Sequence, residues 1–480
     1  MTQPKLNSRL WLILSLLCAV QFMTVLDFSI VNVALPAIQR DLGFSPQNLQ
    51  WIVSAYSLML GGFLLLGGRA ADLFGRRRVF MLGLGLFTIA SLVAGLAQTQ
   101  WVLIAARATQ GLGAAIVSPA ALSTLTTTFA QGKERNLVLS VWGAISAGGF
   151  AVGVLLGGLL TDAVGWRWVM FVNVPIGLLV LVLSPKLLPE SQDSRTKSQI
   201  DLPGAVTITT GLIALVYALE QSSSVGGKTI QTLGLFGAGI VLLISFVFIE
   251  ARSKAPLIPL RVFRNRTVVG ANLIGMMMGA SIGSAVFILT LYMQQVLNYS
   301  ALQTGLAFLP HAIAAIVAAP VASLLTTRFG IQVTLASSTT LAAVGLMHLS
   351  RIPVQGSFVR DLLPGTIIIG LGIVMSLVAV TIAATGSLND REQGMASGLL
   401  NTSQQIGAAL GLAILVATAT ARTEAVLAGA SASAKTAAVT AGFRAALLVG
   451  AGFALAGLLV ALLVIRKGEH RTSENSQQIE

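Results

Sequence analysis

Three ionisable residues stand inside long apolar runs of this chain, where charge is costly: Asp27, Arg107 and His311. A carboxylate in hydrocarbon costs at least about 2.5 kcal/mol even on the milder insertion scale, and such groups usually face an internal cavity. We therefore predict that Asp27 binds a proton or a cationic ligand, and that the charge of Arg107 tunes this carboxyl. His311, whose imidazole titrates near neutral pH, is a second candidate for moving protons; the alternative is a packing histidine held by hydrogen bonds.

Asp27 and Arg107 are predicted to lie at similar depth. At 1.5 Å per residue, Asp27 lies roughly 26 Å along a helix that begins at Leu10. Arg107 lies about 9 Å into an antiparallel helix that begins at Trp101. In a hydrocarbon core of about 30 Å both charges fall in the outer third, within about one turn of each other. A permanent Asp–Arg pair with only a structural role is the alternative to a proton-binding site.

The composition supplies the helices that must position these residues. Of the 480 residues 55% are hydrophobic and 10% are charged, whereas about a quarter of a soluble chain is charged. Apolar segments near 20 residues recur along the whole length, each long enough to cross a bilayer. We predict an all-α membrane protein with fourteen transmembrane helices: 10–34, 49–68, 79–97, 101–122, 137–160, 168–184, 202–221, 229–249, 267–291, 303–325, 331–349, 362–385, 396–419 and 443–465.

The basic residues orient these helices. The net charge is +13, and most of the 30 Lys and Arg residues fall in alternate loops, together with both termini. By the positive-inside rule this places both termini in the cytoplasm and requires an even number of spans. The charge therefore serves orientation in a multi-pass membrane protein, and we expect no nucleic-acid partner.

The sequence lacks the residue patterns that a disulfide, a metal site, an enzyme active site or an ATP-binding loop would need. Cys18 is the one cysteine, so neither a disulfide within the chain nor a cysteine metal motif is expected, and the three histidines are far apart. We predict no metal and no cofactor. A membrane-embedded enzyme would need clustered titratable groups, and a non-transporting sensor would be expected to carry a large soluble domain. Because a phosphate-binding G-x-x-x-x-G-K-[ST] loop is absent, we predict that an ion gradient supplies the energy.

An internal repeat divides the chain. LGFS at 42–45 matches LNYS at 297–300, Phe74-Gly75 returns as Phe329-Gly330, and Gly153 and Gly157 return as Gly407 and Gly411. The offset is 254 or 255 each time, which implies two homologous six-helix bundles with two inserted helices. Parallel repeats are a transporter feature, with the substrate site between the halves. The predicted domains are 1–184, a linker with two extra helices at 185–266, 267–465, and a cytoplasmic tail at 466–480.

The loop GRAADLFGRRR at 68–78 carries a recognisable pattern: Gly68, Asp72, Gly75 and three arginines, Arg76, Arg77 and Arg78. Glycines permit a tight turn, Asp72 can pair with an arginine near a helix end, and the basic residues favour the cytoplasmic face. The pattern resembles the signature loop of the major facilitator superfamily, in which it serves the conformational switch. LDFSIVNVALP at 26–36, RATQGLGAA at 107–115, WRWVMFVNVPIG at 166–177 and DLPG at 201–204 narrow the resemblance to the fourteen-helix drug:proton antiporters.

The fifth helix departs from the antiporter pattern G-x-x-x-G-P-x-x-G-G. Residues 149–158 read GFAVGVLLGG, so Val154 replaces the proline, while all four glycines are present: Gly149, Gly153, Gly157 and Gly158. The glycines predict close helix packing. Without proline the helix should bend less.

The resemblance implies a proton-driven antiporter that exports amphipathic drugs by alternating access, functional as a monomer, with helices 1 and 4 lining its cavity. Export of a metabolite, amino acid or siderophore on the same fold is the alternative. Polar, aromatic and methionine side chains on the spans are the candidate substrate contacts: Asn32, Tyr56, Gln110, Asn272, Met276 and Gln294.

Overall fold

A computed structural model describes residues 8–129, 133–190, 201–224, 230–253, 256–258, 260–386, 390–428 and 434–465. The predicted tail 466–480 lies outside these residues. The described chain is helical, and its contacts group it into two compact units. One unit holds residues 1–257 with 290–309, and the other holds 258–289 with 310–480. Residues 290–309 thus pack with the first unit although the repeat assigns them to the second half; the two-bundle domain boundaries stay a prediction.

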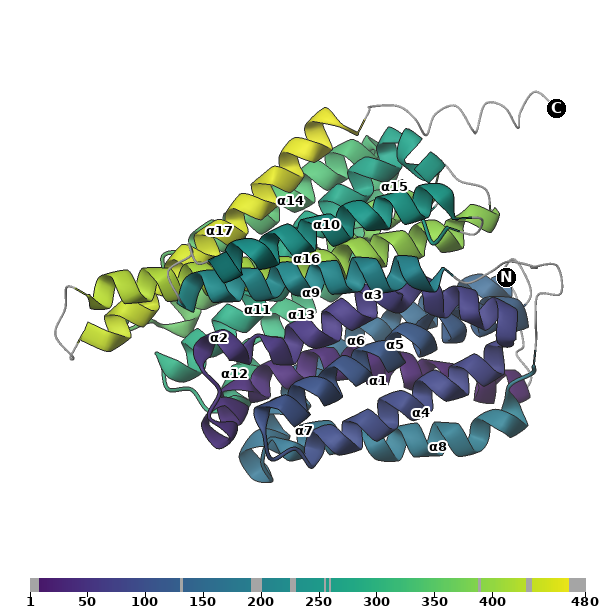
Figure 1. Cartoon of the computed structure of the whole chain (residues 1–480), viewed down its shortest axis with the longest axis horizontal. Coiled ribbons are helices and arrows are strands. Elements are labelled where there is room, and N and C mark those ends of the chain that lie inside the picture. The colour runs from purple at the N-terminus through teal and green to yellow at the C-terminus, as the bar shows by residue number, and fades with distance from the viewer. Residues whose placement is uncertain are drawn as a thin grey trace. The chain divides into compact units, whose positions relative to one another are not determined.

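The first unit contains the N-terminal helices and the inserted pair (Figure 1). Its helices are α1 (Ser8–Leu42), α2 (Pro46–Leu49), α3 (Trp51–Phe74), α4 (Arg76–Gly95), α5 (Gln100–Thr128), α6 (Lys133–Ala163), α7 (Arg167–Phe171), α8 (Asn173–Leu187), α9 (Leu202–Ser224), α10 (Ile230–Arg252) and α12 (Ala301–Ala307). The last turns of α11 (Arg266–Gln295) also belong to this unit.

The second unit contains the rest of α11 and the C-terminal helices. These are the 3₁₀ turn η1 (Leu260–Arg264), α13 (Leu309–Phe329), α14 (Ile331–Leu349), the π-turn η2 (Phe358–Leu362), α15 (Leu363–Thr385), α16 (Asp390–Leu427) and α17 (Lys435–Leu463).

Each of the fourteen predicted spans coincides with helix in the described residues. Among the residues that the structure describes, thirteen helices are long and apolar enough to cross a membrane, which makes this a multi-pass membrane protein. The fourteenth, α14, has 19 residues and carries several polar side chains that are buried in its unit, including Thr334, Ser338 and Thr339. Hydropathy underestimates this helix because hydroxyl groups can bond carbonyls of their own helix, as Ser338 and Thr339 do.

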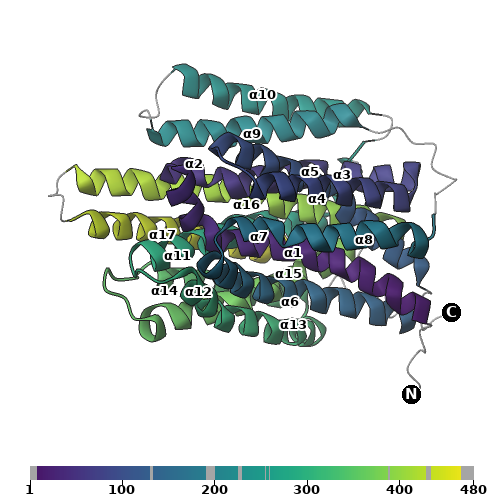
Figure 2. The ribbon, with the colours of Figure 1, turned by 90° about the horizontal axis from the view of Figure 1, so that it is seen from below.

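The inserted helices α9 and α10 lie side by side in both views (Figure 2). Of the two, α9 packs against α3. A Cβ at Gly62 would overlap the Thr209 hydroxyl, and the rings of Trp51 and Tyr217 are 6.4 Å apart. A glycine on α3 therefore lets α9 approach closely.

The internal repeat is visible in helix packing within each unit. A Cβ at Gly113 on α5 would lie 2.7 Å from the Phe87 nitrogen of α4 and 2.9 Å from the Gly83 oxygen. A Cβ at Gly372 on α15 would lie 2.8 Å from the Ala342 nitrogen and the Ser338 oxygen of α14. Positions 83 and 338, and 87 and 342, are each 255 apart. The same backbone approach is thus built twice.

Candidate functional site

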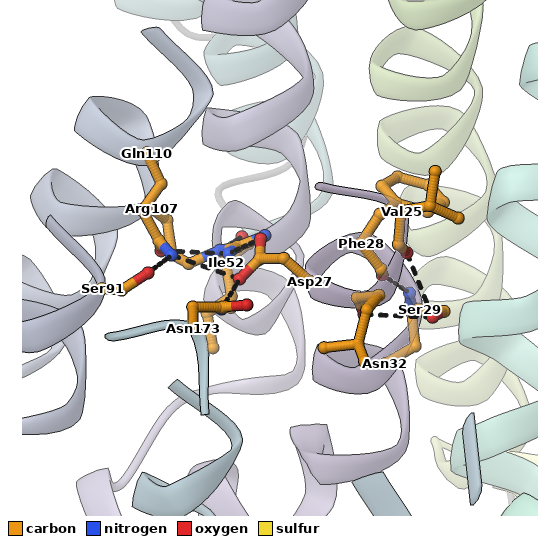
Figure 3. A network of polar contacts seen from close by, with 11 residues as sticks. Val25, Asp27, Phe28, Ser29, Asn32, Ile52, Ser91, Arg107, Gln110 and Asn173 are labelled. Atoms are coloured by element: carbon orange, nitrogen blue, oxygen red, sulfur yellow. Dashed lines mark hydrogen bonds and ion pairs between the residues drawn. The ribbon is translucent and has the colours of Figure 1, made fainter. Parts of the chain in front are cut away.

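Asp27 and Arg107 form an ion pair in the first unit. Arg107 Nη1 on α5 donates to Asp27 Oδ2 on α1 at 2.6 Å (Figure 3). This confirms that the two opposite charges lie at the same height. Their depth was predictable because helix rise fixes height, whereas the contact also required the two side chains to point towards each other.

Three further side chains complete the surroundings of the carboxylate. Gln110 Nε2 and Asn173 Nδ2 donate to Asp27 Oδ1 at 3.2 and 2.9 Å. Gln110 also accepts from Arg107 Nη1 at 3.0 Å and donates to Ser91 Oγ at 2.6 Å. Helices α1, α5 and α8 therefore meet at one acid, and α4 joins them through the bond from Gln110 to Ser91. We call Asp27, Ser91, Arg107, Gln110 and Asn173 the Asp27 cluster.

Arg107 is also fixed to α3. Its Nε donates to the Ile52 carbonyl at 3.0 Å, and its guanidinium carbon lies 4.5 Å from the centre of the Tyr56 ring. A Cβ at Gly111, one turn further along α5, would overlap the Tyr56 carbonyl oxygen, so glycine is required for this close approach. The arginine thus has a carboxylate, a carbonyl and an aromatic face as partners, which is the environment a buried guanidinium needs.

The Asp27 cluster is shut off from solvent in this conformation. Asp27 is 0% exposed and Arg107 1% exposed. A buried ion pair is tolerated because each charge compensates the other, and removal of one partner costs about 3–5 kcal/mol. The structure therefore shows Asp27 and Arg107 as a buried ion pair. A protonation role requires a second conformation in which Asp27 reaches water.

His311 lies on α13, in the other unit. It is buried, with Nδ1 3.2 Å from the Thr366 carbonyl oxygen of α15. A carbonyl can only accept, so this contact assigns the ring proton to Nδ1. Its predicted part in proton movement stays a prediction.

The predicted substrate contacts fall into two groups. Tyr56 and Gln110 belong to the surroundings of Arg107, and both are buried. Asn32 lies on α1 apart from the Asp27 cluster (Figure 3), where its Nδ2 donates to the Phe28 carbonyl. Its Oδ1 is buried and has no hydrogen-bond partner among the residues that the structure describes. Gln294 Nε2, at the end of α11, donates to the Val33 carbonyl at 2.9 Å.

On α11 of the second unit, Asn272 and Met276 take part in helix packing. Asn272 Oδ1 accepts from Ser403 of α16 at 2.9 Å. A Cβ at Gly407 would overlap the Met276 carbonyl oxygen. Drug contact by any of these residues stays a prediction.

The signature loop joins α3 to α4 through a tight turn. Gly75 has φ of 98°, a conformation that side-chain-bearing residues rarely adopt. Arg76 Nη2 lies 3.2 Å from Asp72 Oδ1, so the acid does pair with an arginine. Arg77 Nη1 bonds the Pro185 and Leu188 carbonyls, each at 3.3 Å.

Two more contacts complete this loop. Arg77 and Arg78 lie 3.4 and 3.7 Å from Glu190 Oε2. A Cβ at Gly68 would be 3.5 Å from Pro119 of α5, an ordinary contact. The loop thus ties the α3–α4 turn to the end of α8.

The glycines of α6 face two neighbours. A Cβ at Gly149 would lie 3.3 Å from Val25, one at Gly153 would overlap the Ser29 hydroxyl, and one at Gly157 would lie 2.7 Å from the Ile30 carbonyl oxygen, all on α1. A Cβ at Gly158 would instead lie 2.6 Å from the Ala301 carbonyl oxygen of α12. The predicted close packing therefore exists, on two different helices.

Asn173 and Ser91 were not predicted as site residues. The signal for Asn173 was present in WRWVMFVNVPIG, where one amide interrupts an apolar run. Ser91 carried no such signal, since small hydroxyl residues are common in membrane helices. Among the described residues no group of three or more His, Cys, Asp or Glu side chains could hold a metal ion.

Comparison with known families decides the relationship. The sequence model described as "Major Facilitator Superfamily" matches residues 17–412. The chain belongs to the Major Facilitator Superfamily. Its helical architecture, signature loop and internal repeat are those expected from this membership, which indicates a transporter and not an enzyme.

Similar superfamily proteins are named as resistance and export proteins. The cephamycin export protein CmcT of Amycolatopsis lactamdurans is 42% identical, over 84% of each chain. The puromycin resistance protein pur8 of Streptomyces alboniger is 39% identical, over 88% of this chain and 84% of its own. The multidrug resistance protein Stp of Mycobacterium tuberculosis is 34% identical, over 85% of this chain and 75% of its own.

Solved structures show the same fold at low identity. A POT family transporter superposes with a TM-score of 0.69 at 14% identity, covering 99% of both chains. A point mutant of the nucleoside transporter NupG gives 0.66 at 11% identity, over 95% of this chain and all of its own. At these identities the likeness concerns the fold alone.

Proposed function

We propose that this superfamily member is a proton-driven antiporter that exports amphipathic drugs across the bacterial cytoplasmic membrane. Both termini would be cytoplasmic, and one copy of the chain would suffice. Relatives of 34 to 42% identity named for resistance or export support the drug-export part. The buried acid on α1 supports the proton part.

The coupling residue in this proposal is Asp27. Its carboxylate accepts hydrogen bonds from one arginine and two amides in the conformation described here. A change that opens the Asp27 cluster to water would weaken these bonds and let the carboxylate accept a proton. Arg107 would then lose its charged partner and keep the Ile52 carbonyl and the Tyr56 ring. Proton binding and release would thus be linked to the position of α1 against α5.

Replacement of Asp27 by Asn tests this coupling, because the amide has the same shape and cannot titrate. In inverted membrane vesicles energised by a pH gradient, we expect Asp27→Asn to abolish drug-dependent proton release while expression is retained. Asp41→Asn is the control, since Asp41 pairs with Arg167 at the end of α1 and touches none of the Asp27 cluster. Proton-coupled transport that persists in Asp27→Asn would reject the role of Asp27.

The structural alternative predicts a different outcome. Asp27→Asn leaves Arg107 buried without its anion, so the melting temperature should fall under either reading. If the pair only holds α1 to α5, transport per folded molecule should remain. Measuring both quantities on the same membranes separates the two roles.

A second candidate function is export of one natural product. The names of two relatives each contain a single compound, cephamycin or puromycin. A susceptibility panel in an efflux-deficient host, with and without a protonophore, distinguishes the two cases. Broad protection favours drug export, whereas protection against one compound favours a dedicated exporter.

A further inference from the structure

Residues 290–309 run from the end of α11 through α12, and helices of the first unit hold them at several places. Gln294 Nε2 donates to the Val33 carbonyl and Gln295 Nε2 to Gln39 Oε1, each at 2.9 Å, both on α1. The backbones of α6 and α12 touch at Gly158 and again at Gly305, where a Cβ would overlap the Val154 carbonyl oxygen. Together these contacts join residues 290–309, which belong to the second sequence repeat, to helices of the first repeat.

Asp162, in the last turn of α6, holds the start of α12. Its Oδ1 accepts from the Ala301 nitrogen at 3.2 Å and its Oδ2 from the Leu302 nitrogen at 2.9 Å. The first nitrogens of a helix have no acceptor within the helix. Ser300 and Gln303 satisfy each other's backbone N–H groups in a capping box. The two N–H groups between them are left to a residue of another helix, and Asp162 supplies both acceptors.

We propose that Asp162 is a gate residue that clasps α12 to α6 and thereby keeps the outer end of the transport path closed. This inference rests on the proposed alternating-access function and on the predicted orientation, which places this end of α6 outside. For the path to open outward, α12 must leave α6, and the two bonds to Asp162 must break. Asp162 thus sets how often the outer gate opens, without touching proton or drug.

The contact is suited to a reversible clasp. Asp162 is exposed, so water can replace the carboxylate at both nitrogens when the helices part. Gly158 and Gly305 provide a smooth surface that packs closely without interlocking side chains. Loss of the two bonds to Asp162 should therefore shift the equilibrium between the closed and open outer end and leave the fold intact.

Cysteine labelling measures this opening directly. Thr304 on α12 is fully buried, and the native Cys18 is buried in the core. With Thr304→Cys as background, cells would be treated with a membrane-impermeant maleimide and the alkylation rate compared with and without Asp162→Ala. We expect Asp162→Ala to increase the rate about fivefold, the effect of losing a hydrogen-bonded contact on an equilibrium. Asp162→Asn keeps one of the two acceptors and should fall between.

Two further variants keep the test decisive. Asp361→Ala removes an acid that bonds Arg360 and the Ser357 nitrogen in the other unit, and should leave the labelling rate unchanged. Gly305→Ala should increase labelling by pushing α12 away from α6. If Gly305→Ala accelerates labelling and Asp162→Ala does not, the clasp role of Asp162 is rejected. If labelling rises only in inverted vesicles, the gate is not on the outside and the proposal also fails.

Failure of the gate and failure of the proposed function give different results. The labelling rate reports opening of α12 whether or not any drug is transported. If the protein exports no drug and Asp162→Ala still increases the labelling rate, the gate is supported and the drug-export proposal is rejected. If the protein exports drug and Asp162→Ala leaves the labelling rate unchanged, drug export is supported and the gate is rejected.

Discussion

The two units use the same backbone contact to hold different chemistry. In the first unit α5 meets α3 where Gly111 touches the backbone of Tyr56, and in the second α15 meets α13 where Gly370 would place a Cβ 2.5 Å from the His311 carbonyl oxygen. Positions 56 and 311 are 255 apart, the offset of the repeat, whereas the two glycines are 259 apart and correspond through this contact.

The two units differ in the residue that lies four positions before each of these glycines. Arg107 stands there in α5 and reaches the Ile52 carbonyl of α3, whereas Thr366 stands there in α15 and its carbonyl meets His311 of α13. The position equivalent to Asp27 is Ile282. The repeat has therefore preserved glycine-mediated helix packing and placed the buried charge pair in one half only. The predictions below test whether stability and transport follow this asymmetry.

Loss of Arg107 should have the largest effect on stability. Arg107→Gln leaves Asp27 buried without its cation, and we expect the free energy of unfolding to fall by about 3–5 kcal/mol. Thr366→Ala, four residues before Gly370 of α15, should change it little because its carbonyl remains. Thermal unfolding of the purified protein in detergent measures both. The double variant Asp27→Asn with Arg107→Gln should recover much of the loss; equal melting of Arg107→Gln and wild type would contradict this.

Gly153 of α6 and the equivalent Gly407 of α16 should differ in how well they tolerate substitution by alanine. At Gly407 a Cβ would overlap the Met276 backbone, which cannot move independently, so Gly407→Ala should cost about 1–3 kcal/mol. At Gly153 the overlap is with the Ser29 hydroxyl, which can rotate, so Gly153→Ala should cost less. The same melting assay ranks the pair, and the opposite order would show that the α1–α6 contact is the more rigid.

Removal of a neutral donor to Asp27 should have an intermediate effect. Asn173→Ala deletes a bond to a charged acceptor and should cost about 1.5 kcal/mol, with efflux reduced up to about tenfold. Asn272→Ala deletes the bond to neutral Ser403 in the second unit and should cost less. Drug accumulation in cells and melting of the purified variants give both numbers. A larger loss from Asn272→Ala would place the functional amide in the other half.

The smallest effect is expected at His311. Asn at this position can reproduce the Nδ1 bond to the Thr366 carbonyl and cannot titrate, so His311→Asn should lower efflux less than about threefold. Efflux at several external pH values provides the measurement. Complete loss of transport with normal melting would instead show that His311 carries protons.

The matching height of Asp27 and Arg107 along their helices was predictable from sequence, whereas lateral neighbours were not. Helix rise and the apolar segments placed Asp27 and Arg107 at one level, and their contact followed. Hydropathy does not fix the rotation of a helix about its axis, so it could not show that Asn173 bonds Asp27, that Ser91 bonds Gln110, or that Gly158 faces α12 instead of α1.

Helix ends show a similar limit. The first apolar segment was expected to end at residue 34, and α1 continues to Leu42 through Pro36. The apolar segment at 396–419 is the central part of α16, which spans Asp390–Leu427. Hydropathy detects the part of a helix that lies in hydrocarbon and misses its polar ends, which hydrogen bonding within the helix still supports.

The convergence of several helices on Asp27 also limits how this protein can diversify. A substitution in the Asp27 cluster alters the mutual fit of α1, α4, α5 and α8 together, so few single changes there should survive selection. Laboratory evolution towards new substrates should therefore accumulate its first substitutions on helices of the second unit, and leave the surroundings of Asp27 as they are.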